Sequence, residues 1–208
     1  MNHLAAFVLA SFLFIQVPGP SLLFTIGRAL TQGRRTALLS VVGNALGLLV
    51  QVIAVAVGLG AIVAASAHAY SVLKIAGACY VVWLGIQSIR HRKDARVALE
   101  QGVHVPEEGI LTALRTGFVV GSTNPKTIVF FGAFLPQFAS AQAGSLGWQL
   151  FGLGAIFAAI AVTSDSVWAL VAGRARSWFL AHPKRLDHLG LAGGTMMIGL
   201  GGALVAAE

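Results

Sequence analysis

Apolar residues fall into six long stretches along this chain, separated by short polar segments. The stretches cover residues 4–27, 37–65, 72–89, 110–135, 148–173 and 189–206. Each is long enough to cross a bilayer as a helix, which takes roughly 17–25 residues. Because a span in lipid must satisfy its own backbone hydrogen bonds, the pattern predicts six transmembrane helices in an all-α membrane protein.

Proline interrupts two of these stretches. The first contains Pro18-Gly19-Pro20 and the fourth contains Asn124-Pro125-Lys126. Proline removes a backbone donor and clashes with the preceding turn, so we expect helices 1 and 4 to break there. Carbonyls before each break and amides after it then lose their helical partners.

The two interrupted stretches also resemble each other in spacing. Pro20, Gly27 and Leu30 recur 105 positions later as Pro125, Gly132 and Leu135, and Gly77 and Gly85 recur 116 positions later as Gly193 and Gly201. Repeats of this kind are common in transporters. The echo predicts two three-helix repeats, residues 1–89 and 109–208, joined by a cytoplasmic linker at 90–108.

Composition supports a membrane location and charge gives an orientation. The chain is 57% hydrophobic and 10% charged, whereas soluble domains carry about 25% charged residues. Its net charge of +7 is concentrated in the first, third and fifth loops, while the loops at 66–71 and 138–147 lack Lys and Arg. The positive-inside rule then predicts cytoplasmic basic loops and both termini outside. Three helices per repeat is an odd number, so the second repeat must be inverted, and no nucleic-acid partner is needed to explain the charge.

Two ionisable residues lie inside apolar stretches, Lys126 in the fourth and Asp165 in the fifth. Such residues are rare in membranes and usually mark a proton or substrate site. Counting roughly 1.5 Å per residue puts them about 10 Å apart along the membrane normal, which favours two groups lining one cavity over a direct ion pair. A structural role for Asp165, as a partner for Lys126 or at a helix end, stays open.

Three motif groups resemble the LysE/RhtB family of bacterial amino-acid exporters, over nearly the whole chain. The motifs are Pro18-Gly19-Pro20 with Gly33-Arg34-Arg35 and Gly43-x3-Gly47; Leu73-Lys74-x2-Gly77-Ala78-x-Tyr80-x3-Leu84-Gly85; and Asn124-Pro125-Lys126 with Phe130-Phe131 and Leu135-Pro136-Gln137-Phe138. The resemblance implies a transporter rather than an enzyme. It also implies export of amino acids or related small metabolites across the bacterial inner membrane, driven by the proton gradient. Ser21 and Ala37 depart from residues frequent in the family, and Ser21 would face the cavity.

These observations suggest a mechanism of alternating access. We expect the substrate site to comprise the two breaks and the acid, namely Pro18, Gly19, Pro20, Ser21, Asn124, Pro125, Lys126 and Asp165. Half-helix amides beginning near Ser21 and Lys126 would attract a carboxylate, supplemented by the Lys126 charge. Carbonyls freed before Pro18 and Asn124, together with Asp165, would hold the substrate ammonium or a proton. Asp165 would be the proton-coupling residue.

Two other functions stay open. A divalent-metal exporter would use clustered His, Cys or carboxylates, and a membrane redox relay would use a cysteine pair. The chain has one cysteine, Cys79, and its six histidines do not cluster, so we expect no metal site and no cofactor. The cargo stays open among homoserine, threonine, leucine-like or basic amino acids and their lactones. We also expect a homodimer, from the glycine-rich sixth stretch and the family likeness.

Overall fold

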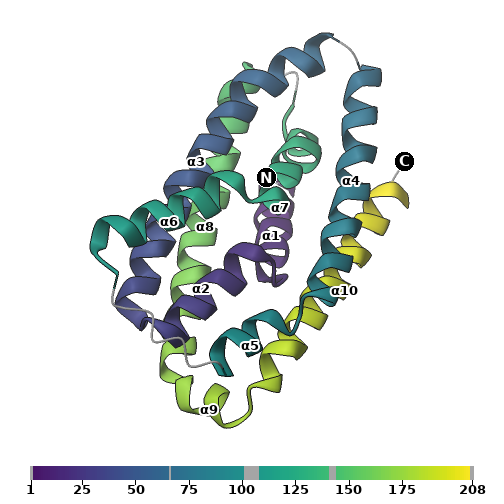
Figure 1. The fold of residues 1–208 in the computed structure, drawn as a ribbon. Coiled ribbons are helices and arrows are strands. Elements are labelled where there is room, and N and C mark those ends of the chain that lie inside the picture. Colours follow the sequence, from purple (N-terminus) through teal and green to yellow (C-terminus); the bar gives the residue numbers. More distant parts are fainter. Residues whose placement is uncertain (1, 66, 101–107, 141–143, 207–208) are drawn as a thin grey trace.

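The structure, a computed structural model, describes residues 2–65, 67–100, 108–140 and 144–206, and these form helices without strands (Figure 1). The elements are α1 (Asn2–Gln16), α2 (Pro20–Thr31), α3 (Arg34–Ala65), α4 (Ala67–Arg90), α5 (Asp94–Glu100), α6 (Ile110–Thr123), α7 (Pro125–Val129), the π-helical η1 (Phe130–Phe134), the 3-10 helix η2 (Leu135–Phe138), α8 (Leu146–Arg174), α9 (Arg176–Ala181) and α10 (Lys184–Ala206). The all-helical prediction is confirmed. The predicted linker contains the short helix α5, and its residues 101–107 lie outside the described ranges.

Helices break at both proline motifs. The axes of α1 and α2 differ by 53°, and between them Gly19 is extended at φ −127° and ψ −175°. Pro20 then occupies the first turn of α2, where its missing N–H has no helical acceptor to lose. At the second break Asn124 is extended at φ −63° and ψ 107°, and its side chain accepts a hydrogen bond from the Lys126 N–H at 3.1 Å. Proline therefore ends one helix and begins the next at each site.

All six predicted stretches are helical, but fewer meet a strict test for spanning a membrane. Among the described residues, three helical segments are long and apolar enough, namely Arg34–Gly58, Ile110–Phe138 and Leu146–Arg174. The bent pair His3–Gln16 and Pro20–Thr31 makes a fourth if it counts as one span, and Ile75–Arg90 is a shorter apolar helix. The described part of the chain thus contains three or four candidate spans by length and composition.

Glycines let α3 and α6 pack backbone against backbone. A Cβ on Gly117 would collide with the Ser40 carbonyl, and one on Gly121 with the Asn44 carbonyl. Both contacts join residues 77 positions apart (117 − 40 and 121 − 44), so the two helices run parallel. Small residues at such an interface allow the close approach that drives helix association in lipid.

The second and third helices of the two predicted repeats pair in opposite directions. Between α3 and α8, Gly154 faces Val52 and Gly173 faces Arg34. Between α4 and α10, Gly85 packs against Gly194 while Gly201 packs against Ala78. In each pair the residue number rises along one helix as it falls along the other, so both pairs are antiparallel, as the colours in Figure 1 show.

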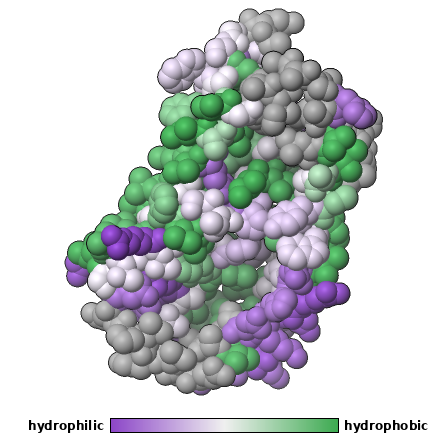
Figure 2. All heavy atoms as spheres, turned by 45° about the horizontal axis from the view of Figure 1, so that its top comes forward, coloured by the Kyte–Doolittle hydropathy of each residue, from purple (hydrophilic) through white to green (hydrophobic). Residues whose placement is uncertain are grey.

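The surface and the core suit a lipid environment. Aliphatic and aromatic side chains lie exposed on α1, α3, α6 and α8, while the core at the centre is built on Phe14, Phe130, Phe131 and Phe157. Figure 2 shows hydrophobic residues over much of one face and hydrophilic residues gathered toward its lower part. Extended apolar surface of this kind marks contact with a membrane or a partner.

A buried arginine joins α2 to the start of α6. Arg28 donates to both carboxylate oxygens of Glu108, at 2.8 and 2.7 Å, and to the Ser40 hydroxyl at 3.0 Å. The hydrogen bond from Arg28 lowers the pKa of Glu108. Burial acts in the opposite direction, and a further hydrogen bond from Gln32 lowers the pKa as well. A bidentate pair of this geometry is stronger than an ordinary surface ion pair.

We therefore expect the Arg28–Glu108 pair to make stability depend on acid pH. A carboxyl whose folded pKa is lowered stabilises the fold above its ordinary pKa of 4.5, and this stabilisation is lost as pH falls through the lowered value. Glu108→Gln should lower the melting temperature of the detergent-solubilised protein at pH 7 by roughly 2–4 °C, the equivalent of about 1 kcal/mol. The difference from wild type should shrink as pH falls through this lowered value. Glu100→Gln, at an exposed acid, is the control, and equal pH profiles for Glu108→Gln and wild type would contradict the assignment.

Candidate substrate site

The two helix breaks meet at one small internal cavity. Its walls come from α1, α2, α3, α7, α8 and Asn124, and its lining residues are Phe14, Ile15, Gly19, Ser21, Leu22, Asn44, Leu48, Asn124, Lys126, Thr127, Phe157, Ala161 and Asp165. The space for solvent is about 30 Å³. At roughly 10–15 Å³ of such volume per water, this holds about two water molecules. This volume is smaller than an amino acid.

Five of the eight predicted site residues line this cavity: Gly19, Ser21, Asn124, Lys126 and Asp165. The three prolines do not. Pro18 is buried with its carbonyl against Gly193 of α10, Pro20 is exposed beside a separate cleft, and Pro125 begins α7. Their contribution is to break the helices rather than to line the cavity.

The Lys126 ammonium binds the carbonyls freed at the first break. Its Nζ donates to Phe14 O at 2.7 Å and to Val17 O at 2.6 Å, and it lies 4.5 Å from the centre of the Phe14 ring. Because Pro18 has no N–H, the Phe14 carbonyl cannot make its usual helical bond. Both carbonyls therefore already have an internal partner, as buried carbonyls require, and their binding of a substrate ammonium stays a prediction.

Gln51 of α3 performs the same task at the second break. Its Nε2 donates to the carbonyls of Gly121, Ser122 and Asn124 at 2.9, 3.0 and 3.3 Å, and its Oε1 accepts from the Thr127 hydroxyl at 2.8 Å. These carbonyls are not open to a ligand either. Nothing in the segment around Gln51 shows that it reaches a break 70 residues away.

The two half-helix N-termini differ in their capping. The first turn of α2 lines the cavity, and its N-cap residue Gly19 provides no side-chain cap. At α7 the Asn124 side chain already caps the Lys126 amide. Ser21 donates to Asn44 Oδ1 at 3.0 Å, so Asn44 of α3 belongs to the same wall. The α2 terminus therefore offers the cavity first-turn amides that no side chain caps.

Asp165 faces the same cavity from α8. Its residue is 5% exposed, and so is Lys126. In the described part of the chain no hydrogen bond or ion pair reaches the Asp165 carboxyl, and Lys126 does not pair with it directly. A buried carboxylate without a partner is costly. The group is therefore suited to hold a proton or to bind a cation that enters the cavity.

The cavity has no set of metal ligands. Across the described residues, no group of three or more His, Cys, Asp or Glu side chains is placed to hold a metal ion. Cys79 is a free thiol on the exposed side of α4. The arrangement instead combines amides, one ammonium and one carboxyl, which are complementary to a small zwitterion or a proton.

The sequence also matches known proteins. The sequence model of the LysE type translocator family matches residues 12–208. The homoserine/homoserine lactone efflux protein of Salmonella typhimurium is 32% identical over 203 residues, covering 98% of this chain and 96% of that protein. An uncharacterized membrane protein of Vibrio cholerae is 32% identical over 208 residues with the same coverage. The threonine efflux protein of Escherichia coli K12 is 27% identical over 139 residues, covering 65% of this chain and 66% of that protein. No solved structure matches.

The apolar helices, the polar cavity at their breaks and these matches define a membrane transport protein rather than an enzyme. The chain belongs to the LysE type translocator family. As a member of this family, the protein lies in a lipid membrane and has a small-molecule substrate.

Proposed function

We propose that this protein exports a small amino acid or a closely related metabolite from the bacterial cytoplasm by proton antiport and alternating access. The observation that carries the proposal is the convergence of both helix breaks and Asp165 on one cavity. Relatives named for homoserine, homoserine lactone and threonine efflux favour a short polar cargo. A metal cargo has no comparable support in the described residues, which hold no cluster of metal ligands.

We propose further that six spans form two inverted three-helix repeats in the inner membrane, with both termini outside. The contacts between α4 and α10 support this. Gly85 meets Gly194, and Gly201 meets Ala78. Shifting the first pair by the repeat spacing of 116 gives the second, since 85 + 116 is 201 and 194 − 116 is 78. Such reciprocity is what a two-fold axis in the membrane plane would produce. A homodimer stays a prediction.

In the proposed cycle the substrate carboxylate binds the first-turn amides of α2, beside Ser21 and Asn44. Those amides form the positive end of a helix dipole. The substrate ammonium competes with Lys126 for the carbonyls of Phe14 and Val17, so Lys126 occupies the ammonium site when the cavity is empty. Substrate entry then releases Lys126 and widens the cavity. Asp165 takes up a proton on one side and releases it on the other.

The role of Lys126 leads to a specific prediction. Lys126→Met should retain substrate binding within about threefold, because the ammonium site is vacated rather than removed. Transport should fall by at least about tenfold, since the carbonyls of Phe14 and Val17 lose the partner that closes the empty cavity. Binding is measured by isothermal calorimetry and transport by counterflow in proteoliposomes. Lys184→Met, at an exposed lysine, is the control.

A different outcome would assign Lys126 to the substrate carboxylate. In that case Lys126→Met would weaken binding by about a hundredfold, as expected for the loss of a buried charge-assisted hydrogen bond. Its melting temperature would also match that of wild type. This pair of results would overturn the ammonium-site assignment while leaving the export function untouched.

Radiolabelled counterflow across a panel of amino acids tests the export function itself. Proteoliposomes loaded with homoserine, threonine, leucine or lysine should accumulate labelled homoserine or threonine fastest. Absence of counterflow for every amino acid, combined with uptake of a divalent cation, would refute the proposal.

A further inference from the structure

A second and larger cleft lies away from the substrate cavity, where α2, α8, α9 and α10 meet. Its volume is about 700 Å³, within the range of pockets that bind small ligands. Apolar side chains dominate its walls, including Ile26 of α2, Val171 and Ala172 of α8 and Leu189 of α10. Val171 is half exposed, so the cleft opens at the protein surface.

One end of this cleft is cationic. Arg185 and His188, from the first turns of α10, belong to its lining together with Trp178 of α9. The Arg185 guanidinium lies 3.4 Å from the centre of the Trp178 ring, and Nη1 donates to the Trp178 carbonyl at 2.7 Å. Within the described ranges no carboxylate pairs with Arg185, and the neighbouring Asp187 is engaged by Arg96 at 3.0 Å. The lining of this apolar cleft therefore includes a guanidinium that is held in place and has no carboxylate partner among the described residues.

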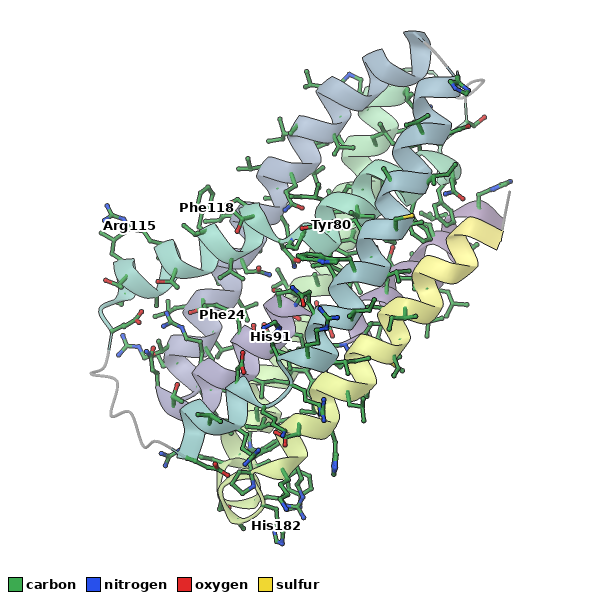
Figure 3. All side chains as sticks on the ribbon, turned by 45° about the vertical axis from the view of Figure 1, so that its right-hand side comes forward. Phe24, Tyr80, His91, Arg115, Phe118 and His182 are labelled. Atoms are coloured by element: carbon green, nitrogen blue, oxygen red, sulfur yellow. The ribbon has the colours of Figure 1, made fainter. Side chains whose placement is uncertain are left out.

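The position of this end matches the edge of the bilayer. Arg185 lies four residues before the apolar stretch that begins at residue 189, and α8 ends at another basic residue, Arg174. Tryptophan and arginine are typical of the membrane interface. Figure 3 shows His182, in the turn between α9 and α10, at the lower end of the molecule. Trp178 and Arg185 flank that turn in sequence.

We propose that the cleft binds one anionic phospholipid, with an acyl chain along Val171, Ala172 and Leu189 and the phosphate on Arg185. Charge complementarity selects this occupant, because the phosphate of a zwitterionic lipid is already offset by the ammonium of its own headgroup and an uncharged lipid offers no anion. Basic pockets between membrane helices at the cytoplasmic side bind anionic headgroups in this way. Arginine suits the role because its remaining N–H groups can bind phosphate oxygens in pairs. The site is separate from the cavity of Lys126 and Asp165, so it stands whether or not the proposed cargo is correct.

Native mass spectrometry of the detergent-solubilised full chain tests the proposal, with phosphatidylglycerol and phosphatidylcholine of identical acyl chains as probes. Wild type should bind one phosphatidylglycerol at least about tenfold more tightly than phosphatidylcholine. Arg185→Gln should remove most of this preference, and Arg185→Lys should retain part of it because the charge stays. Val171→Trp, which fills the exposed side of the cleft, should weaken binding of both lipids. Arg174→Gln, an exposed arginine outside the cleft lining, is the matched control and should bind as wild type does.

Several results would overturn this assignment. Equal affinity for the two lipids would remove the headgroup role, and equal losses for Arg174→Gln and Arg185→Gln would show general attraction to basic charge. Lipid binding unchanged by Val171→Trp would place the acyl chain elsewhere. A wild-type dimer that Val171→Trp dissociates, with no change in lipid binding, would assign the cleft to a second copy of the chain. Thermal unfolding of each variant without lipid verifies that it is folded.

Discussion

Asp165→Asn is expected to lose uphill, proton-driven efflux by at least about tenfold while retaining substrate exchange. The carboxyl is buried at the cavity and, among the described residues, has no hydrogen-bond or ion-pair partner that would explain it as structural. Asparagine has nearly the same shape but cannot carry a proton, so binding survives and coupling does not. Net efflux under an imposed pH gradient and counterflow at equal pH measure the two activities separately.

The control for this variant is Thr163→Val, two residues earlier on the exposed side of α8. Its efflux should match wild type at every pH. If Asp165→Asn exports substrate as fast as wild type, with the same dependence on pH, Asp165 is not the proton carrier. If counterflow is lost as well, Asp165 binds the substrate rather than only the proton.

Gly117→Ala is expected to give the largest loss of stability. The added Cβ would overlap the carbonyl oxygen of Ser40 on α3. It would also lie 2.8 Å from the carbonyl carbon and 2.9 Å from the Cα of Ser40. These are backbone atoms, so the overlap can be relieved only if α3 and α6 move apart. Gly43, Gly47 and Gly121 also allow close contact along this parallel interface. Overpacking on a rigid backbone costs about 3 kcal/mol, or roughly 6–12 °C in melting temperature for a chain of this length.

Gly152→Ala provides the matched control, since a Cβ there meets nothing within 4 Å on the same type of helix. Its melting temperature should stay level or rise slightly, because alanine favours helix over glycine by up to about 1 kcal/mol. Fluorescence-detected melting of both variants in one detergent makes the comparison. Equal melting temperatures for Gly117→Ala and Gly152→Ala would mean that α3 and α6 are not in backbone contact.

Proline and charge made much of this architecture predictable from the sequence. The breaks at Pro18 and Pro125 follow from the missing N–H of proline, a local property that any context must accommodate. The shared cavity of Lys126 and Asp165 follows from their cost in lipid, which forces such residues to face the interior. The antiparallel packing of α4 and α10 agrees with the glycine echo between the two halves.

The hydrogen bonds that satisfy the breaks were not predictable. Lys126 reaches carbonyls 109 and 112 residues earlier in the chain, and Gln51 reaches across to α6 and Asn124. Which polar side chain meets which freed carbonyl depends on how the helices pack, and that is set by many apolar contacts together. The cleft at Arg185 depends on the direction in which α9 turns the chain. The hydrophobic periodicity of the sequence does not predict that direction.

Simultaneous measurement of proton and substrate flux in proteoliposomes tests the central claim most directly. Vesicles with an internal pH-sensitive dye are loaded with the amino acid that gives the fastest counterflow, and export is started by dilution. We predict that the lumen acidifies in step with substrate efflux in wild type and stays constant with Asp165→Asn. Efflux from wild-type vesicles with no change in lumenal pH would contradict a proton-coupled exporter built on this cavity.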